Sequence, residues 1–205
     1  IRDRDIIGNS YLKQKKINLE KVDIVFCGYG VYAPEYEWDD YKDIDVKGKI
    51  VVVLVNDPPI MNGSNFDPSM FKGSAMTYYG RWSYKYEEAL RRGAAGAIVI
   101  HETGPAGYPF SVLQSGHNAE NLTIENKSSL QFEGWIPLKT AKRLFAMSGT
   151  TFTNMKKKSL SKTFTPEVLN VKFISRISNT FRNVSSENVV AVSYTHLTLP
   201  TIVGV

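Results

Sequence analysis

The segment KYEEALRRGAAGAIVIHE, residues 85–102, constrains the fold more strongly than any other part of the chain. Apolar side chains recur at helical spacing in and just before it, namely Trp82, Tyr86, Ala89 and Leu90. Gly93 follows two arginines, which is typical of a helix that ends in a left-handed glycine. Residues 97–101 then form an apolar run of strand length. So short a Gly/Ala connection requires the helix to pack closely on a sheet, and we expect a fold that combines α and β structure.

Apolar runs and turn residues predict further elements. The most distinct is residues 49–55, a β-branched strand that Pro58 and Pro59 end. The other expected strands and helices cover residues 21–27, 130–136, 138–148 and 151–160. The expected irregular segments are a weak helix or extended lead-in at 6–19 and loops at 35–45, 62–73 and 104–131. After a boundary at 163–166, residues 171–181 and 188–192 predict a hairpin.

The composition is that of a globular protein with one sizeable core, or one domain and part of another. The chain has 205 residues, of which 42% are hydrophobic, and its net charge is +5. No apolar run approaches the roughly 18 residues that a membrane helix needs. The basic residues concentrate after Lys139, but Lys156–Lys158 fit the solvated face of a short helix, so we expect no nucleic-acid partner. Without an initiator Met, Ile1 is expected to lie inside a longer gene product.

Two features near the first strand resemble functional motifs without their context. Cys27 is the only cysteine, which excludes an internal disulfide and a cysteine-based zinc cluster, and we expect it to be a small buried side chain. GYGVYA, residues 28–33, matches a dinucleotide-binding fingerprint. However, Pro34 and four acidic residues follow where a phosphate-binding helix should begin, so a glycine turn is the better interpretation.

The histidines do not form a recognisable catalytic or metal-binding pattern. His101 ends a strand, whereas His117 and Glu120 share a Gly/Asn-rich segment. A zinc site needs at least three protein ligands, so the sequence predicts neither catalytic residues nor metal ligands. A small complete enzyme that uses these three residues stays open as an alternative. His196 follows a strand-like run, a common place for a ligand in α/β enzymes.

Aromatic side chains are concentrated in two segments. The acidic residues of segment 35–45 lack the spacing of a calcium-binding loop. The aromatic residues between them, Tyr36, Trp38 and Tyr41, indicate packing or partner contact instead. The denser segment gives the candidate partner- or substrate-contact surface: Tyr78, Tyr79, Trp82 and Tyr84. The alternative is that about half of these rings belong to the core.

Three segments resemble the protease-associated (PA) domain inserted in bacterial two-zinc aminopeptidases, which are related to aminopeptidase Y and glutamate carboxypeptidase. These are residues 23–59 (DIVFCGYGVYAPEYEWDDYKDIDVKGKIVVVLVNDPP), 75–102 (AMTYYGRWSYKYEEALRRGAAGAIVIHE) and 133–149 (EGWIPLKTAKRLFAMSG). The resemblance implies an α+β fold: a mixed β structure with flanking short helices, plus the first strand pair of an absent α/β catalytic domain. The implied divisions are a lead-in at 1–20, the PA domain at 21–149, a helix and linker at 150–166, the opening hairpin of the catalytic domain at 167–192, and a tail at 193–205.

The same resemblance implies a function. The PA domain would cap the active site of a zinc-dependent aminopeptidase and influence peptide access, without being catalytic itself. The parent would hold two zinc ions, act outside the cytoplasm and meet its peptide substrates through the missing catalytic domain. Whether this chain is an enzyme is left open, and it is expected to be inactive and without a cofactor. A free-standing peptide- or protein-binding PA module is the alternative.

The chain departs from this family after Val192. Thr198 stands where the family's His-x-Asp pair, which supplies the first zinc ligands, would place the aspartate after His196. The segment SYTHLTLPTI also resembles translated sequencing-adapter tails at the ends of fragmentary gene models. We therefore expect residues 193–205 to be non-native, His196 to have no function, and the 171–192 hairpin to leave an apolar face unsupported, formed by Phe173, Ile177, Val189 and Val190.

Overall fold

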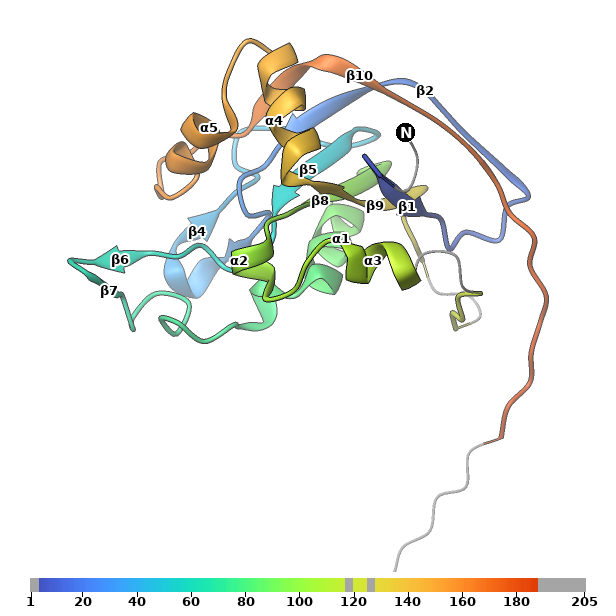
Figure 1. The fold of residues 1–205 in the computed structure, drawn as a ribbon, viewed down its shortest axis with the longest axis horizontal. Coiled ribbons are helices and arrows are strands. Elements are labelled where there is room, and N and C mark those ends of the chain that lie inside the picture. Colours follow the sequence, from blue (N-terminus) through green and yellow to red (C-terminus); the bar gives the residue numbers. More distant parts are fainter. Residues whose placement is uncertain (1–3, 117–119, 125–127, 188–205) are drawn as a thin grey trace, which may run out of the picture.

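A computed structural model describes residues 4–116, 120–124 and 128–187. These residues form an α+β fold around one six-stranded, curled, mixed sheet with the order β1-β9-β8-β5-β2-β10 (Figure 1). The strands are β1 (Ile7–Asn9), β9 (Phe132–Pro137), β8 (Gly96–His101), β5 (Ile50–Leu54), β2 (Lys16–Phe26) and β10 (Glu167–Ser178). The four inner strands are parallel to one another, and β1 and β10 pair antiparallel at the two edges.

Five α-helices and several short elements connect the strands within the described residues. The helices are α1 (Trp82–Arg91), α2 (Thr103–Ala106), α3 (Ser111–Gly116), α4 (Leu138–Met147) and α5 (Phe152–Lys158). Two 3-10 helices are η1 (Pro34–Tyr36) and η2 (Tyr78–Gly80). Two small hairpins consist of β3 (Tyr32–Ala33) with β4 (Trp38–Asp39), and β6 (Met61–Asn62) with β7 (Asn65–Phe66). Among the described residues, no helix is long and apolar enough to cross a membrane.

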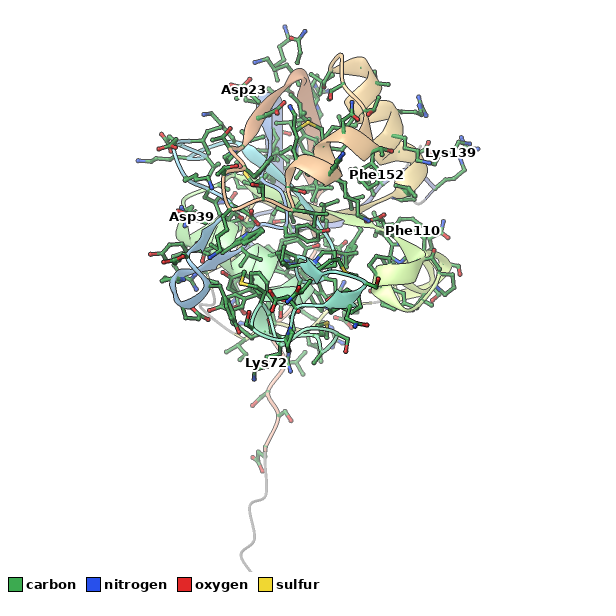
Figure 2. All side chains as sticks on the ribbon, turned by 90° about the vertical axis from the view of Figure 1, so that its left-hand side faces the viewer. Asp23, Asp39, Lys72, Phe110, Lys139 and Phe152 are labelled. Atoms are coloured by element: carbon green, nitrogen blue, oxygen red, sulfur yellow. The ribbon has the colours of Figure 1, made fainter. Side chains whose placement is uncertain are left out.

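The core has two layers, one on each face of the sheet. The alternation of side chains along β5 produces this division, because Ile50, Val52 and Leu54 point to one face and Val51 and Val53 to the other. The first face packs on α4 and α5, and the second packs on α1. Side chains fill the interior on both sides (Figure 2). All five residues of β5 are buried, which explains why this strand is continuously apolar in sequence.

The helix-to-strand unit has the predicted form. The helix α1 ends before Gly93, whose φ is +74° and whose amide donates to the Leu90 carbonyl at 2.9 Å. The next strand, β8, is buried along its whole length. A Cβ on Gly96 would lie 2.7 Å from the Phe132 carbonyl oxygen, so this glycine permits the close approach of β8 and β9.

The glycine turn after β2 is also confirmed, because Gly28 and Gly30 have positive φ and no phosphate-binding helix follows. The carboxylate of Asp40 closes this turn by accepting from the backbone amides of Tyr29 (3.1 Å) and Val31 (3.0 Å). Cys27 is buried as expected, and burial raises the pKa of its thiol well above the ordinary value. In the acidic segment, Trp38 and Tyr41 are buried and Tyr36 packs on Phe71, so these rings serve packing.

The irregular segments contain more structure than the sequence predicts. The lead-in is extended, and β2 begins at Lys16 because Ile17 and Leu19 alternate into the core. The prediction of loops at 35–45, 62–73 and 104–131 is wrong in part. These segments hold β4, the β6–β7 hairpin, and the short helices α2 and α3. None of these elements has enough periodic apolar residues to be visible in the sequence.

The strand after residue 166 continues the sheet. It runs from Glu167 to Ser178 and pairs antiparallel with β2. The expectation of an unsupported apolar face is wrong for Phe173 and Ile177, which pack against the core, with the Phe173 ring 4.8 Å from that of Phe132. The remainder of the predicted hairpin, with Val189 and Val190, and the 193–205 tail with His196 lie outside the described residues. The division of the chain into domains stays a prediction.

Candidate ligand-binding groove

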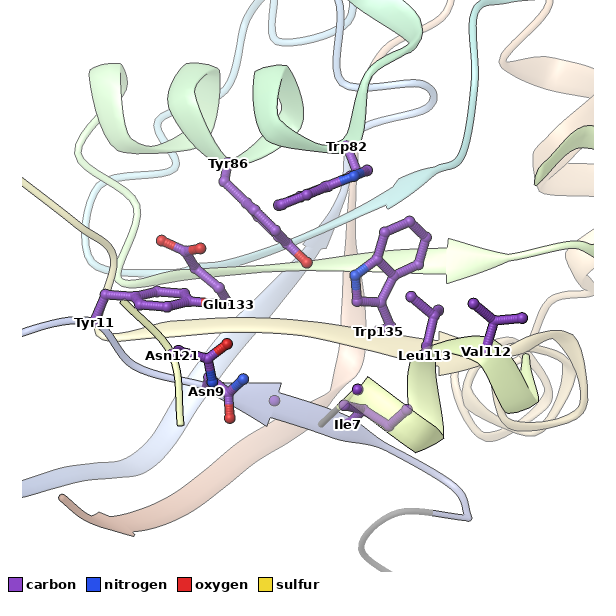
Figure 3. A pocket seen from close by; sticks show the side chains of 12 residues that line it. Ile7, Asn9, Tyr11, Trp82, Tyr86, Val112, Leu113, Asn121, Glu133 and Trp135 are labelled. Atoms are coloured by element: carbon purple, nitrogen blue, oxygen red, sulfur yellow. The ribbon is translucent and has the colours of Figure 1, made fainter. Parts of the chain in front are cut away.

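A groove of about 310 Å³ lies between the start of α1, the helix α3 and the β1–β9 edge of the sheet (Figure 3). We call it the aromatic groove. Its lining includes four aromatic rings from three parts of the chain and one carboxylate: Tyr11, Trp82, Tyr86, Glu133 and Trp135. Val112 and Leu113 of α3 line it as well. The volume lies at the lower end of the range for small-molecule sites, which suits a single side chain or a small ligand.

Local structure explains how these residues meet. Glu133 and Trp135 are two residues apart on β9 and therefore point to the same face of the sheet. Trp82 and Tyr86 are four residues apart on α1 and share one side of the helix. The Tyr86 hydroxyl donates to the Gly134 carbonyl at 2.9 Å, which fixes α1 above β9.

The rings differ in how far solvent reaches them. The side chains of Tyr86 and Trp135 are buried and form the floor. Trp82 is 53% exposed, and its ring lies edge-on to Tyr86 with the centroids 5.9 Å apart. Trp82 therefore forms a rigid rim on a packed floor, and a ligand would gain contact area without displacing the core.

The groove contains one carboxylate. Glu133 is the one charged side chain among the described residues that line it. Burial raises the pKa of Tyr11, and the negative charge of Glu133 raises it further. The pKa of Tyr86 is raised well above its ordinary value by the same two effects in the same order. Figure 3 shows the carboxylate on the side of β9 that faces α1.

The four predicted contact residues differ in their exposure to solvent. Tyr84 is 3% exposed, and its hydroxyl donates to the Tyr32 carbonyl at 3.1 Å, so its assignment to a surface is corrected. The rings of Tyr78 and Tyr79 pack on Tyr84, and burial raises the pKa of Tyr79 to about 12. Tyr78 is 52% exposed and donates to Glu87. Of the four predicted residues, Trp82 alone lines the aromatic groove.

Sequence reasoning missed Tyr11, Glu133 and Trp135. The signal for the last two was the alternation in FEGWIP, which places both side chains on one face of a strand. Tyr11 lies between β1 and β2 and carries no comparable local signal.

A second polar cluster is buried at the start of α1, away from the groove. Lys85 is fully buried, and its ammonium group donates to the carbonyls of Tyr29 (2.6 Å) and Asn56 (3.0 Å). Burial lowers the pKa of Lys85 to about 8, while Asp57 and Asp40 act in the opposite direction. Burial raises the pKa of Asp40 to about 7, although the Val31 amide and Lys85 favour its charged form. This cluster connects α1 to two loops and serves the fold.

The histidine alternative is not supported by the residues that the structure places. His101 is buried at the end of β8 beside Tyr108, Phe110 and Trp135, and its Nε2 has no hydrogen-bond partner among the described residues. Glu120 accepts from Arg182 at 2.9 and 3.0 Å. His117 lies outside the described residues. Within the described parts of the chain, no group of three His, Cys, Asp or Glu residues is placed to hold a metal ion.

The chain was compared with known proteins. No protein-family model matches it, and no curated protein was found to be similar in sequence.

Proposed function

We propose that this chain is the non-catalytic, PA-like portion of a zinc-dependent aminopeptidase, where it caps the active site and influences which peptides enter. The resemblance of residues 23–59, 75–102 and 133–149 supports this proposal. A mixed sheet with helices on both faces is compatible with the PA domain that the resemblance implies. The proposal includes peptide partners and a location outside the cytoplasm. In this proposal the two zinc ions belong to the parent's catalytic domain.

The aromatic groove carries the proposal. Peptide-contact surfaces combine exposed aromatic rings with a few polar groups that fix orientation. Here Trp82 supplies the exposed ring, Tyr86 and Trp135 supply a packed floor, and Glu133 supplies the polar group. Since helix and sheet position these groups, the groove is formed before any peptide arrives.

A free-standing peptide-binding module is the second candidate, and one observation favours it. A strand pair that opens another domain would count against a separate module, because a module has no need for it. In the structure, however, β10 pairs with β2 and packs Phe173 on the shared core, so this strand has a structural role within the same sheet. Reading the genomic DNA beyond the codon of Val192 separates the candidates, because the parent enzyme requires a downstream His-x-Asp pair and the module does not.

Peptide contact is tested by titrating the ¹⁵N-labelled chain with a mixture of short neutral and charged peptides. The chain has three tryptophans, whose indole N–H signals report on different places. We expect the signals of Trp82 and Trp135 to shift. That of Trp38 should stay constant, because its Nε1 donates to buried Asp40 at 2.9 Å. The same sample should release no dye from aminoacyl substrates. Unchanged indole signals with every peptide, or chelator-sensitive dye release, would contradict the proposal.

A further inference from the structure

We propose that residues 103–116 form a strap over His101 that acid releases, and that this release opens one wall of the aromatic groove. The strap consists of α2, α3 and the loop between them (Figure 1). The release follows from the surroundings of His101, whereas its effect on peptide contact rests on the proposed function.

The His101 imidazole lies among aromatic rings. It is 2% exposed. The ring centroids of Tyr108 and Phe110 in the strap lie 5.3 and 5.5 Å from that of His101, and the Trp135 centroid lies 6.2 Å away. Nε2 of His101 has no hydrogen-bond partner among the described residues. A proton added at Nε2 would therefore bury a positive charge whose new N–H meets no acceptor from these residues, which is costly.

The groups that face His101 offset this cost only in part. Burial lowers the pKa of His101, whereas hydrogen bonds to the backbone of Tyr108 and of His101 itself and the charge of Glu102 act in the opposite direction. Both Glu102 oxygens already accept from Lys156 at 2.8 Å. Burial raises the pKa of Tyr108 in the strap and of Tyr86 on α1, so both phenols are neutral in acid. The β9 side chain that meets His101 is an indole, which does not titrate.

The strap is held more weakly than the strands beneath it. None of residues 103–116 is buried. Ala106, Phe110 and Leu113 pack against the core as half-buried side chains, and Asn56 Nδ2 donates to the Pro105 carbonyl at 3.2 Å. Segments with few buried contacts open locally at a small part of the global free energy of unfolding. Opening would expose the imidazole to water, where its protonation carries no burial cost.

The pH dependence has a definite sign. The open strap leaves His101 with its ordinary pKa of 6.5, and the closed strap lowers that pKa. Protons therefore favour the open form as the pH falls through about 6.5, and the closed form is fully stable above that value. At pH 5 the shift toward the open form has an upper limit of about 30-fold, reached if the closed form takes up no proton.

Release would change the aromatic groove because the strap forms part of its lining. Val112, Leu113 and Gly116 of α3 line the groove opposite the rings of α1 and β9. We therefore expect peptide contact to weaken in acid and to recover at neutral pH.

Hydrogen exchange of the full chain at pH 7.5 and pH 5 tests the release. The amides of Ala106 and Leu113 donate to the Glu102 and Phe110 carbonyls at 2.9 and 3.0 Å. After correction for the intrinsic effect of pH on exchange, these amides should lose protection by about 3- to 30-fold in acid, and the amides of α4 by less than about 2-fold. Unchanged protection in the strap, or an equal loss in α4, would overturn the proposal.

Variants assign the effect to one histidine. His101→Phe keeps a ring among the other rings and removes the titrating group, so exchange of the strap should no longer depend on pH. His117→Gln is the matched control, since His117 follows α3 in the sequence, and it should retain the pH dependence. The opposite pattern would overturn the assignment. If His101→Phe does not fold, the imidazole signals of the unsubstituted chain decide, because titration of His101 at or above pH 6.5 would contradict the proposal.

Titrations with the neutral peptides at both pH values separate this proposal from the proposed function. Shifts of the Trp82 and Trp135 indole signals that weaken in acid would support both. Acid release of the strap without peptide binding at either pH would overturn peptide contact and leave the strap standing. Equal peptide binding at both pH values while the strap opens would overturn the link between the strap and the groove.

Discussion

Replacing Lys85 with methionine tests whether the buried cluster at the start of α1 stabilises the fold. Methionine keeps an unbranched, apolar side chain in a site where Lys85 is fully buried. The change removes the charged donor from the carbonyls of Tyr29 and Asn56, which accept at 2.6 and 3.0 Å. It also removes the cation beside Asp40 and Asp57.

The expected loss in the free energy of unfolding is about 3 kcal/mol. Breaking a buried charge network by removing one partner costs roughly 3–5 kcal/mol. Methionine recovers part of this because the lysine's own desolvation penalty disappears, as the lowering of its pKa to about 8 indicates. The value therefore lies at the lower end of that range.

The loss should grow with pH. Asp40 has a folded-state pKa of about 7, above its ordinary 3.8, so its contribution to stability is present at low pH and is lost as pH rises through the folded value. Without Lys85 this pKa rises further, which extends the loss above pH 7. The pKa of Lys85 is lowered, so the cost of burying its positive charge applies in full below about pH 8 and is relieved above it. This relief occurs in the unsubstituted chain and not in the variant. Between pH 6 and pH 8 the Asp40 effect is the one that acts, and it makes the variant relatively less stable at pH 8 than at pH 6.

Urea unfolding followed by circular dichroism at pH 6 and pH 8 measures the loss in the free energy of unfolding and its dependence on pH. Lys142→Met on the exposed side of α4 is the control, and we expect it to change the free energy of unfolding by less than about 0.5 kcal/mol. A Lys85→Met variant within 1 kcal/mol of the unsubstituted chain at both pH values would refute the reasoning.

Three further predictions concern the backbone, the sheet edge and the thiol. Gly93→Val should lower the free energy of unfolding by about 1 kcal/mol or more, because φ is +74°. Gly104→Ala should lower it less, because this glycine has no positive φ and open space around it; equal midpoints of the two variants in thermal unfolding would refute this. Phe173→Ala should lower the free energy of unfolding by about 2 kcal/mol, because Phe173 packs against the core. Ile174→Ala, at a side chain that is 57% exposed on the other face, should lower it by less than about 1 kcal/mol, and equal urea midpoints of the two variants would contradict the packing. Cys27 should react with iodoacetamide only as fast as the chain unfolds, and rapid labelling of the folded chain would show that the thiol is accessible.

Local patterns predicted the elements whose signals lie within one segment. The α1–β8 unit was visible because helical spacing, Gly93 and the apolar run of β8 are adjacent in the chain. The partner of β10 was not visible, because β2 lies far away in sequence and the pairing depends on which edge of the sheet remains open. Periodicity shows that a strand has an apolar face and does not show which strand lies next to it.

The candidate site could be predicted in part. Trp82 was selected from its segment, but the same criterion selected Tyr84, which lies beneath the Tyr78 and Tyr79 rings. Composition cannot separate Trp82 from Tyr84, because both are aromatic side chains of the same helix. The groove exists because β9 brings Glu133 and Trp135 beneath α1, and that juxtaposition depends on tertiary structure.

The most direct test of peptide contact at the aromatic groove is to locate a bound peptide by nuclear Overhauser effects in solution. We expect contacts from side-chain protons of the peptide to the ring protons of Trp82 and Trp135, with none to Tyr78. Contacts to Tyr78 or Tyr79 without any to Trp82 would place peptide recognition elsewhere, and the aromatic groove would then not be the binding site.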